Sequence, residues 1–252
     1  RAAREAGAAS VLIANFTWSA IYGHLLETEQ PDAGLAGRAR RVIERMQAEY
    51  DMGDLLLVPG LDVPLRACRE RCDIPLIARR GQRRRDELAR ELGLDPTRPI
   101  LLVYLGTEGR RGVDWEAVAA MRIAGGPPQL VGYRAPEGAA GLILPLPTGM
   151  HHADATASVD AVITKPGYST AAECLAGGTP VLFTPRPQFA EGTAIERALV
   201  EAGIGLCIPE ADFLAGEWQP WVDRVLALGR AANPTDGSGG RVAAETILSF
   251  AR

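Results

Sequence analysis

The sequence predicts an α/β fold with two Rossmann-like domains, each a parallel sheet covered by helices, and three observations support this prediction. Short apolar runs bounded by Gly, Pro or Asp recur along the 252 residues. Several of these runs are apolar throughout, as expected for parallel strands that are buried on both faces. Helical patterns lie between most of the runs, and this strand–helix–strand order is typical of a doubly wound sheet.

The apolar runs and the patterns between them give the expected elements in chain order. Strands are expected at residues 10–16, 54–59, 74–78, 99–106, 128–133, 141–146, 161–164, 180–184 and 205–208. Helices are expected at residues 35–50, 84–92, 114–122, 169–177, 191–202, 217–229 and 240–251.

A charged segment separates two groups of strands. Residues 79–98 are rich in Arg, lack a strand and end in a Pro-flanked loop, which favours a solvated linker and helix face over an anion-binding patch. We therefore predict a domain over residues 1–90 and a second, more complete Rossmann-like domain over residues 91–252. Residue 1 is not Met and lies in a helical pattern directly before a strand. We expect a fragment whose first domain is incomplete.

Composition narrows the function classes. With 47% hydrophobic residues and a net charge of -4, the chain is an ordinary globular protein with no expected affinity for nucleic acid. It has no apolar run long enough to span a bilayer and no signal peptide, so a cytoplasmic protein is expected. Cys68 and Cys72 are spaced to share a helix face, but no further ligand lies nearby, so neither a metal site nor a disulfide framework is expected.

The stretch DAVITKPGYSTAAECLAGGTPVL, residues 160–182, contains the clearest candidate site. A buried strand leads through a Pro-Gly turn into a helix with Ser169 or Thr170 as N-cap and with Glu173 near capping-box spacing. A helix N-terminus at the carboxyl end of a parallel strand presents N–H groups and a positive dipole, which suit a phosphate or diphosphate. Capping alone would explain every residue of the helix start except Lys165 and Tyr168, so a purely structural crossover remains an alternative.

A resemblance to a known family favours a ligand-binding role for this stretch over a purely structural one. DAVITKPGYSTAAECLAGGTPVLFTPRPQFAE resembles the donor-binding segment of the glycosyltransferases of GT-B architecture, and within them the peptidoglycan N-acetylglucosaminyltransferase (MurG type) and galactolipid synthase group. VLIANFTWSAIYGHLL is similar to a stretch of related transferase-like proteins. The resemblance implies a metal-independent transferase without a cofactor. It would move a sugar from a nucleotide-sugar donor, in particular a UDP-sugar, to an acceptor that the sequence does not identify.

The same resemblance implies roles for individual residues. Glu173 would bind the ribose hydroxyls, Lys165 would neutralise the leaving diphosphate, and Glu191 would contact the sugar. The residues implied at the diphosphate are Gly106, Thr107, Gly167, Tyr168, Ser169, Thr170 and Arg186. Three alternatives stay open, namely a solvated Lys165, an exposed loop Arg186, and a Glu191 that only complements a helix N-terminus.

The acceptor is expected beside the first strand. The residues expected on this side are Asn15, Thr17, Trp18 and Tyr22. Trp18 and Tyr22 are four apart on a helix, so core packing explains them as well as acceptor stacking does. His151 and His152 are predicted as loop residues, because no acidic partner lies at an evident spacing, and a catalytic role stays as the alternative.

No catalytic base can be named from the sequence. Relatives carry a Gly-rich loop after their first strand, often with the base, and this chain starts downstream of it, so the fragment alone is expected to lack a base of its own. Asp-x-Asp, the usual metal and diphosphate binder of the other large glycosyltransferase architecture, is also missing. Two alternative functions remain, a non-catalytic nucleotide-sugar-binding domain (regulatory or fused to a sugar kinase) and a nucleotide-sugar epimerase or hydrolase.

Overall fold

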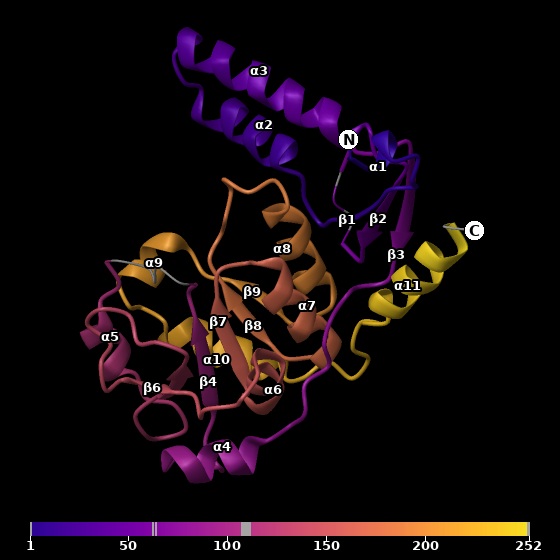
Figure 1. Cartoon of the computed structure of the whole chain (residues 1–252). Helices are drawn as coiled ribbons and strands as arrows, with labels where there is room; N and C mark the ends of the chain where they lie inside the picture. The colour runs from indigo at the N-terminus through magenta and orange to yellow at the C-terminus, as the bar shows by residue number, and fades with distance from the viewer. Residues whose placement is uncertain (1, 62, 64, 107–111, 251–252) are drawn as a thin grey trace. The chain divides into compact units, whose positions relative to one another are not determined.

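The computed structural model describes residues 2–61, 63, 65–106 and 112–250, and its contacts divide the chain into two compact units (Figure 1). The first unit comprises residues 1–78, 186–195 and 236–252, and the second comprises residues 79–185 and 196–235. The boundary after residue 78 falls at the start of the charged segment. The C-terminal residues 236–252 belong to the first unit and not to the second.

The first unit contains a three-stranded parallel sheet in the order β1-β2-β3. Its elements are α1 (Ala2–Glu5), β1 (Val11–Ile13), α2 (Trp18–Glu29), α3 (Ala33–Tyr50), β2 (Leu55–Pro59), β3 (Glu70–Ile74) and α11 (Gly239–Phe250). Side chains cap two of the helices. Thr17 accepts a hydrogen bond from the backbone of Ala20 at the start of α2, and Asp32 accepts from Gly34 and Leu35 at the start of α3.

The expected strand at residues 74–78 is wrong, because the strand ends at Ile74. β3 instead covers Glu70–Ile74, whose polar residues are mostly exposed and therefore give no apolar signal in the sequence. Pro75 has no N–H to donate to a ladder, which explains the end of the strand. Beyond it, Ile77 makes only an isolated antiparallel bridge to Ser238, just before α11.

The second unit is built on a six-stranded parallel sheet in the order β6-β5-β4-β7-β8-β9. The strands are β4 (Ile100–Tyr104), β5 (Gln129–Gly132), β6 (Ile143–Pro145), β7 (Ala161–Thr164), β8 (Val181–Phe183) and β9 (Gly205–Cys207). The chain proceeds outward from β4 in one direction and then from β7 in the other, so the strand order reverses between these two strands. The two parallel sheets confirm the predicted α/β class, and ligands of such sheets bind beyond the carboxyl ends of the strands at the reversal.

Helices connect these strands. They are α4 (Arg85–Leu92), α5 (Trp115–Ala120), α6 (His152–Ser158), α7 (Tyr168–Gly177), α8 (Gly192–Glu201), α9 (Glu210–Leu214) and α10 (Gln219–Leu228). The division between the units falls inside α8. The prediction of a loop at the start of α6 is wrong, because His152 is already the first residue of the helix.

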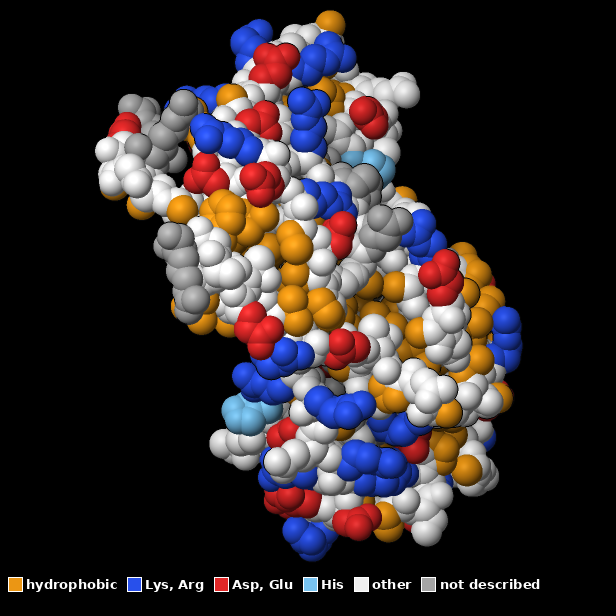
Figure 2. All heavy atoms as spheres, turned by 90° about the vertical axis from the view of Figure 1, so that its right-hand side faces the viewer, with side chains coloured by type: hydrophobic (Ala, Val, Ile, Leu, Met, Phe, Trp, Pro, Cys, Tyr) orange, Lys and Arg blue, Asp and Glu red, His pale blue; other side chains and the backbone are white. Residues whose placement is uncertain are grey.

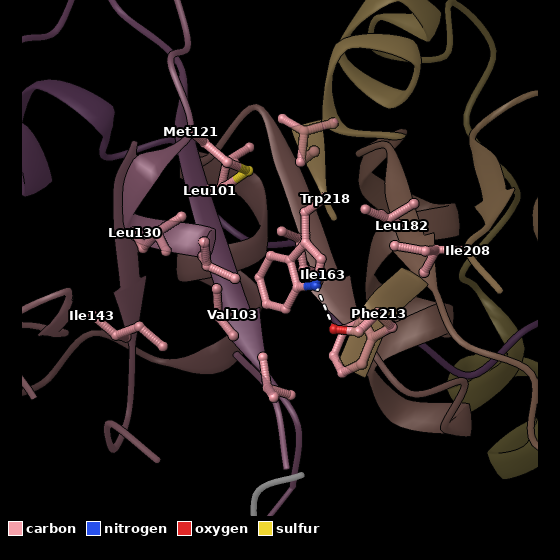
Figure 3. Close-up of a cluster of buried hydrophobic side chains, with 14 of the residues drawn as sticks. Leu101, Val103, Met121, Leu130, Ile143, Ile163, Leu182, Ile208, Phe213 and Trp218 are labelled. Carbon is pink, nitrogen blue, oxygen red and sulfur yellow. Dashed lines mark hydrogen bonds between the residues drawn. The ribbon is translucent and has the colours of Figure 1, made fainter. Parts of the chain in front are cut away.

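The core of the second unit lies between the sheet and the chain around α9 and α10 (Figure 3). Trp218 is fully buried, stacks on Phe213 with ring centroids 4.9 Å apart, and donates its indole N–H to the Phe213 carbonyl oxygen at 2.8 Å. Apolar side chains of several strands join this cluster, among them Leu101, Ile163 and Leu182. Because the indole N–H is satisfied, the large ring is buried without the penalty of an unpaired donor.

Positive and negative side chains are mixed over the face shown in Figure 2. None of the helices in the described part of the chain combines the length and the apolar character needed to cross a bilayer.

Candidate functional site

The candidate site begins where β4 and β7 end, at the reversal of the strand order. Tyr104 and Thr164 are the paired last residues of the two strands. The Thr164 hydroxyl donates a hydrogen bond to the Tyr104 carbonyl oxygen at 2.6 Å and ties the strand ends together. The loop after β4 and the turn before α7 therefore start side by side.

Gly106 and Lys165 meet at this edge. A Cβ on Gly106 would lie 2.8 Å from Nζ and 2.9 Å from Cε of Lys165, so the lysine side chain occupies the space beside the glycine backbone. Gly106 also has a φ of +87°, a conformation that disfavours any other residue. Two residues predicted for the diphosphate are thus in contact, whereas Thr107 lies outside the described residues.

The turn into α7 differs from the capping prediction. The N-cap is Gly167, with extended φ and ψ of -127° and 141°, and Ser169 and Thr170 lie inside the first turn. The predicted capping box is therefore wrong. Gly167 has no side chain to accept from the first N–H groups, and a Cβ at this position would meet no atom within 4 Å. A helix N-terminus of this kind, beside a lysine and with open space at its N-cap, has the geometry and charge of an anion site.

Glu173 projects from the second turn of α7 toward the start of α6. Its Oε2 lies 2.5 Å from Nδ1 of His152, and the two side chains are 16% and 23% exposed. Three aromatic rings meet here. Tyr133, which follows β5, stacks on the His152 ring at 5.7 Å with an interplanar angle of 4°, and Tyr104 packs its edge at 4.9 Å. The sequence prediction treated His152 as a loop residue without an acidic partner, and the structure supplies that partner 21 residues away.

Two ionisable groups around Glu173 have shifted pKa values. Burial, reinforced by the negative charge of Glu173, raises the pKa of Tyr133 to about 12. Burial also raises the pKa of the Cys174 thiol far above its ordinary value, which makes this cysteine an inert core residue.

Arg186 and Glu191, the other two charged residues predicted at the donor, belong to the first unit. The Arg186 guanidinium lies 3.2 Å from the ring centroid of Phe189. Glu191 is only 7% exposed, and its Oε2 has no hydrogen-bond partner within the described residues. A buried carboxylate oxygen without a partner is costly. This carboxylate is therefore suited to accepting hydrogen bonds from ligand hydroxyls.

The residues predicted on the acceptor side lie at the start of α2. Thr17 is buried and serves as the helix cap, and Asn15 is half-buried. Trp18 and Tyr22 stack with ring centroids 5.6 Å apart and are 47% and 42% exposed. These two rings are therefore not core residues, which removes the packing alternative but does not test the acceptor role.

The cysteine pair does not share a helix face, so that interpretation is wrong. Cys72 lies in β3, and Cys68 lies in the preceding loop with a φ of +61°. The described part of the chain contains no group of three or more His, Cys, Asp or Glu side chains that could hold a metal ion.

Comparison with known proteins adds sequence relatives. No model of a known protein family matches the chain. The chain is 26% identical over all 252 residues to L-arabinokinase from Arabidopsis thaliana, of which it covers 23%. Over 88% of its length it is 31% identical to the UDP-N-acetylglucosamine–N-acetylmuramyl-(pentapeptide) pyrophosphoryl-undecaprenol N-acetylglucosamine transferase of Frankia casuarinae, of which it covers 62%. The chain thus spans less than two thirds of either relative.

Solved structures with the same fold include two glycosyltransferases. The calicheamicin glycosyltransferase superposes with a TM-score of 0.56 at 15% identity, over 99% of this chain and 70% of that one. A UDP-glucosyltransferase from Polygonum tinctorium gives a TM-score of 0.55 at 14% identity, over 99% of this chain and 67% of that one. At this identity the likeness concerns the fold alone, and it confirms the GT-B fold that the sequence resemblance implied.

Proposed function

We propose that this chain takes part in the transfer of a sugar from a nucleoside diphosphate sugar. It has the GT-B glycosyltransferase fold and distant homologues among the peptidoglycan N-acetylglucosaminyltransferases. In this proposal the second unit binds the donor, in particular a UDP-sugar. The acceptor oxygen bonds to the anomeric carbon and gives up its hydroxyl proton to a base, while the bond from that carbon to the diphosphate breaks and the nucleoside diphosphate leaves.

The observation that carries the proposal is the open N-terminus of α7 beside a lysine. Gly167 leaves the N-cap open, and Lys165 brings a positive charge to the same strand end, where it packs beside Gly106. Negative charge grows on the diphosphate as its bond to the anomeric carbon of the sugar breaks. N–H dipoles and an ammonium group that are already in place stabilise that charge without reorganisation, and this lowers the barrier for the transfer.

Glu173 supplies the second part of the donor site. A carboxylate one turn into the helix can accept hydrogen bonds from ribose hydroxyls while the diphosphate lies at the helix start. The carboxylate is only 16% exposed, so a hydrogen bond to it is less weakened by competing water.

Arg186 and Glu191 have proposed roles that rest on the family resemblance. Glu191 would accept hydrogen bonds from hydroxyls of the donor sugar, which agrees with its buried, unpartnered oxygen. Arg186 would contact the diphosphate. On the acceptor side, the exposed stack of Trp18 and Tyr22 offers apolar ring faces to an acceptor. No residue is assigned as the catalytic base.

Nucleoside diphosphate binding tests the proposal directly. We expect UDP to raise the melting temperature of the wild-type chain, and we expect Glu173→Gln to weaken the affinity for UDP about tenfold, since a hydrogen bond to a charged group is lost. Glu201→Gln, at an exposed position on α8, is the matched control and should bind like the wild type. A wild type that no nucleoside diphosphate stabilises, or a Glu173→Gln variant with unchanged affinity, would refute the donor site.

A second candidate function is a nucleotide-sugar-binding domain without transferase activity. The similarity to L-arabinokinase favours it, because the match spans this whole chain but only 23% of that protein, whose name is that of a kinase. The two functions differ in turnover. A transferase releases UDP from a UDP-sugar when a suitable acceptor is present, whereas a binding domain holds the donor and releases none.

A further inference from the structure

His152 lies beside the Glu173 carboxylate, which is proposed to bind ribose, and the proposed function gives His152 no role. Its Nδ1 faces Glu173 Oε2 at 2.5 Å, and because a carboxylate only accepts, Nδ1 carries the hydrogen. Nε2 lies 3.5 Å from the Thr170 hydroxyl, which can donate to it. Both ring nitrogens thus face α7, where their partners Thr170 and Glu173 lie about one turn apart.

The plane of the His152 ring is fixed by its aromatic neighbours. Tyr133 covers one face in a nearly parallel stack, with 4° between the ring planes, and Tyr104 packs at 68° to the ring. The two tyrosines also contact each other at 5.8 Å. His152 is therefore held by contacts from β4, from Tyr133 just after β5 and from α7, and the direction of its Nδ1–H is set before any ligand binds.

The fixed N–H group of His152 restricts the orientation of the Glu173 carboxylate. The terminal torsion of a glutamate side chain is broad, so a carboxylate without a partner samples many orientations. Here His152 holds Oε2, and within the described residues Oε1 of Glu173 has no hydrogen-bond partner. Ordering a side chain in advance removes an entropic cost that the ligand would otherwise have to meet on binding.

We propose that His152 is a positioning residue for the donor, holding Glu173 through Nδ1 so that Oε1 is directed at the hydroxyl groups of a ribose. This inference rests on the proposed function of Glu173 and extends it to substrate selection. A carboxylate held in one orientation favours a ribonucleoside diphosphate over its 2′-deoxy counterpart, and that preference depends on His152.

Calorimetric binding of three probes tests the inference. The probes are UDP, 2′-deoxy-UDP and inorganic pyrophosphate, which has no ribose. We expect His152→Ala to weaken UDP binding about tenfold, to weaken 2′-deoxy-UDP binding less, and to leave pyrophosphate binding unchanged. His152→Asn, which keeps an N–H donor near the Nδ1 position, should restore most of the affinity for UDP. The neighbouring His151 is exposed and makes no side-chain cap bond, so His151→Ala is the matched control and should bind all probes normally.

A double-mutant cycle shows whether His152 acts through Glu173. When Glu173 is already Gln, adding His152→Ala should cause little further loss of UDP affinity. Equal weakening of UDP and pyrophosphate by His152→Ala would overturn the inference, because that pattern indicates damage to the whole pocket. Tighter UDP binding would also overturn it and would mean that His152 competes with the ribose.

The inference and the proposed function fail in different ways. If Glu173→Gln weakens UDP binding and His152→Ala does not, only the positioning role is refuted. If the wild-type chain binds no nucleoside diphosphate, the donor site is refuted and the positioning role falls with it.

Discussion

The side chain of Lys165 packs against the backbone of Gly106, so closely that a Cβ at residue 106 would lie 2.8 Å from the lysine Nζ. The two residues follow β7 and β4, which are neighbours at the reversal of the strand order. A side chain at residue 106 would push the end of the lysine aside, and the φ of +87° at Gly106 adds a second reason for glycine.

We expect Gly106→Ala to displace the lysine and to weaken pyrophosphate and UDP binding about tenfold, as the loss of one charge-assisted contact would. Gly112→Ala is the control, since Gly112 has the same φ of +87° but a Cβ added there would meet nothing within 4 Å. Both variants carry the backbone strain, so the difference between them in calorimetry measures the contact with Lys165. Equal affinities in the two variants would contradict this explanation.

The sequence can predict that Gly106 and Lys165 lie at the same edge of the sheet, but it cannot predict the contact between His152 and Glu173. Parallel strands with continuous apolar runs are visible as such, and their carboxyl ends share one edge by topology. The partners His152 and Glu173, in contrast, lie on two helices, and their contact depends on how these helices pack. A single sequence carries no periodic signal for such a contact.

The errors in the fold have equally local causes. The sequence does not predict β3, because an exposed edge strand with the sequence ERCDI lacks the apolar pattern of a buried one. The capping box at Ser169 or Thr170 follows from residue types, but the helix begins earlier, with Gly167 as its N-cap. Helix ends inferred from composition are uncertain by such margins.

The return of α11 to the first unit depends on a second glycine. A Cβ on Gly239 would lie 1.9 Å from the Pro75 carbonyl oxygen, and the Gly239 N–H donates to the Leu76 carbonyl oxygen at 3.0 Å. We expect Gly239→Ala to lower the free energy of unfolding by about 2 kcal/mol, because the helix must move away from the apolar core around Ala243.

The neighbouring glycine is the control for that variant. A Cβ on Gly240 would meet nothing within 4 Å, so Gly240→Ala should leave stability unchanged or raise it by up to about 1 kcal/mol through helix propensity. Denaturant titration of both variants measures the difference. A Gly239→Ala protein as stable as Gly240→Ala would show that α11 does not need the close approach.

Arg230 joins the ends of two helices in the second unit. Its guanidinium donates to the carbonyl oxygens of Gly177, Ala157 and Val159 and to the hydroxyl of Thr179. Burial lowers its pKa from the ordinary arginine value. We expect Arg230→Met to destabilise the protein by about 3 kcal/mol, because several buried acceptors lose a charged donor together.

Arg224→Met provides the comparison for Arg230. Arg224 is exposed and lies 4.8 Å from the Trp221 ring centroid, so its loss should cost at most about 1 kcal/mol. Thermal and denaturant unfolding of the two variants measure this contrast. Similar losses in both would indicate that the buried hydrogen bonds of Arg230 add no more than an exposed contact.

Tyr133 should make stability depend on alkaline pH. Its pKa in the folded protein is raised to about 12, first by burial and then by the charge of Glu173, whereas a tyrosine in the unfolded chain has a pKa near 10. Between these values the unfolded chain loses the proton and the folded one keeps it. The stability present below pH 10 is therefore lost as the pH rises toward 12. Because Tyr133 is 43% exposed, the loss should be modest.

The phenolate absorbance of the wild type minus that of Tyr133→Phe isolates this group among the five tyrosines. The difference should titrate well above the ordinary tyrosine value, and the loss of stability above pH 10 should be smaller in Tyr133→Phe. Removing the neighbouring charge in Glu173→Gln should lower the pKa of Tyr133, since like-charge repulsion then no longer opposes the phenolate. An ordinary pKa for Tyr133, or one that does not respond to Glu173→Gln, would contradict the close placement of the phenol and the carboxylate on either side of His152.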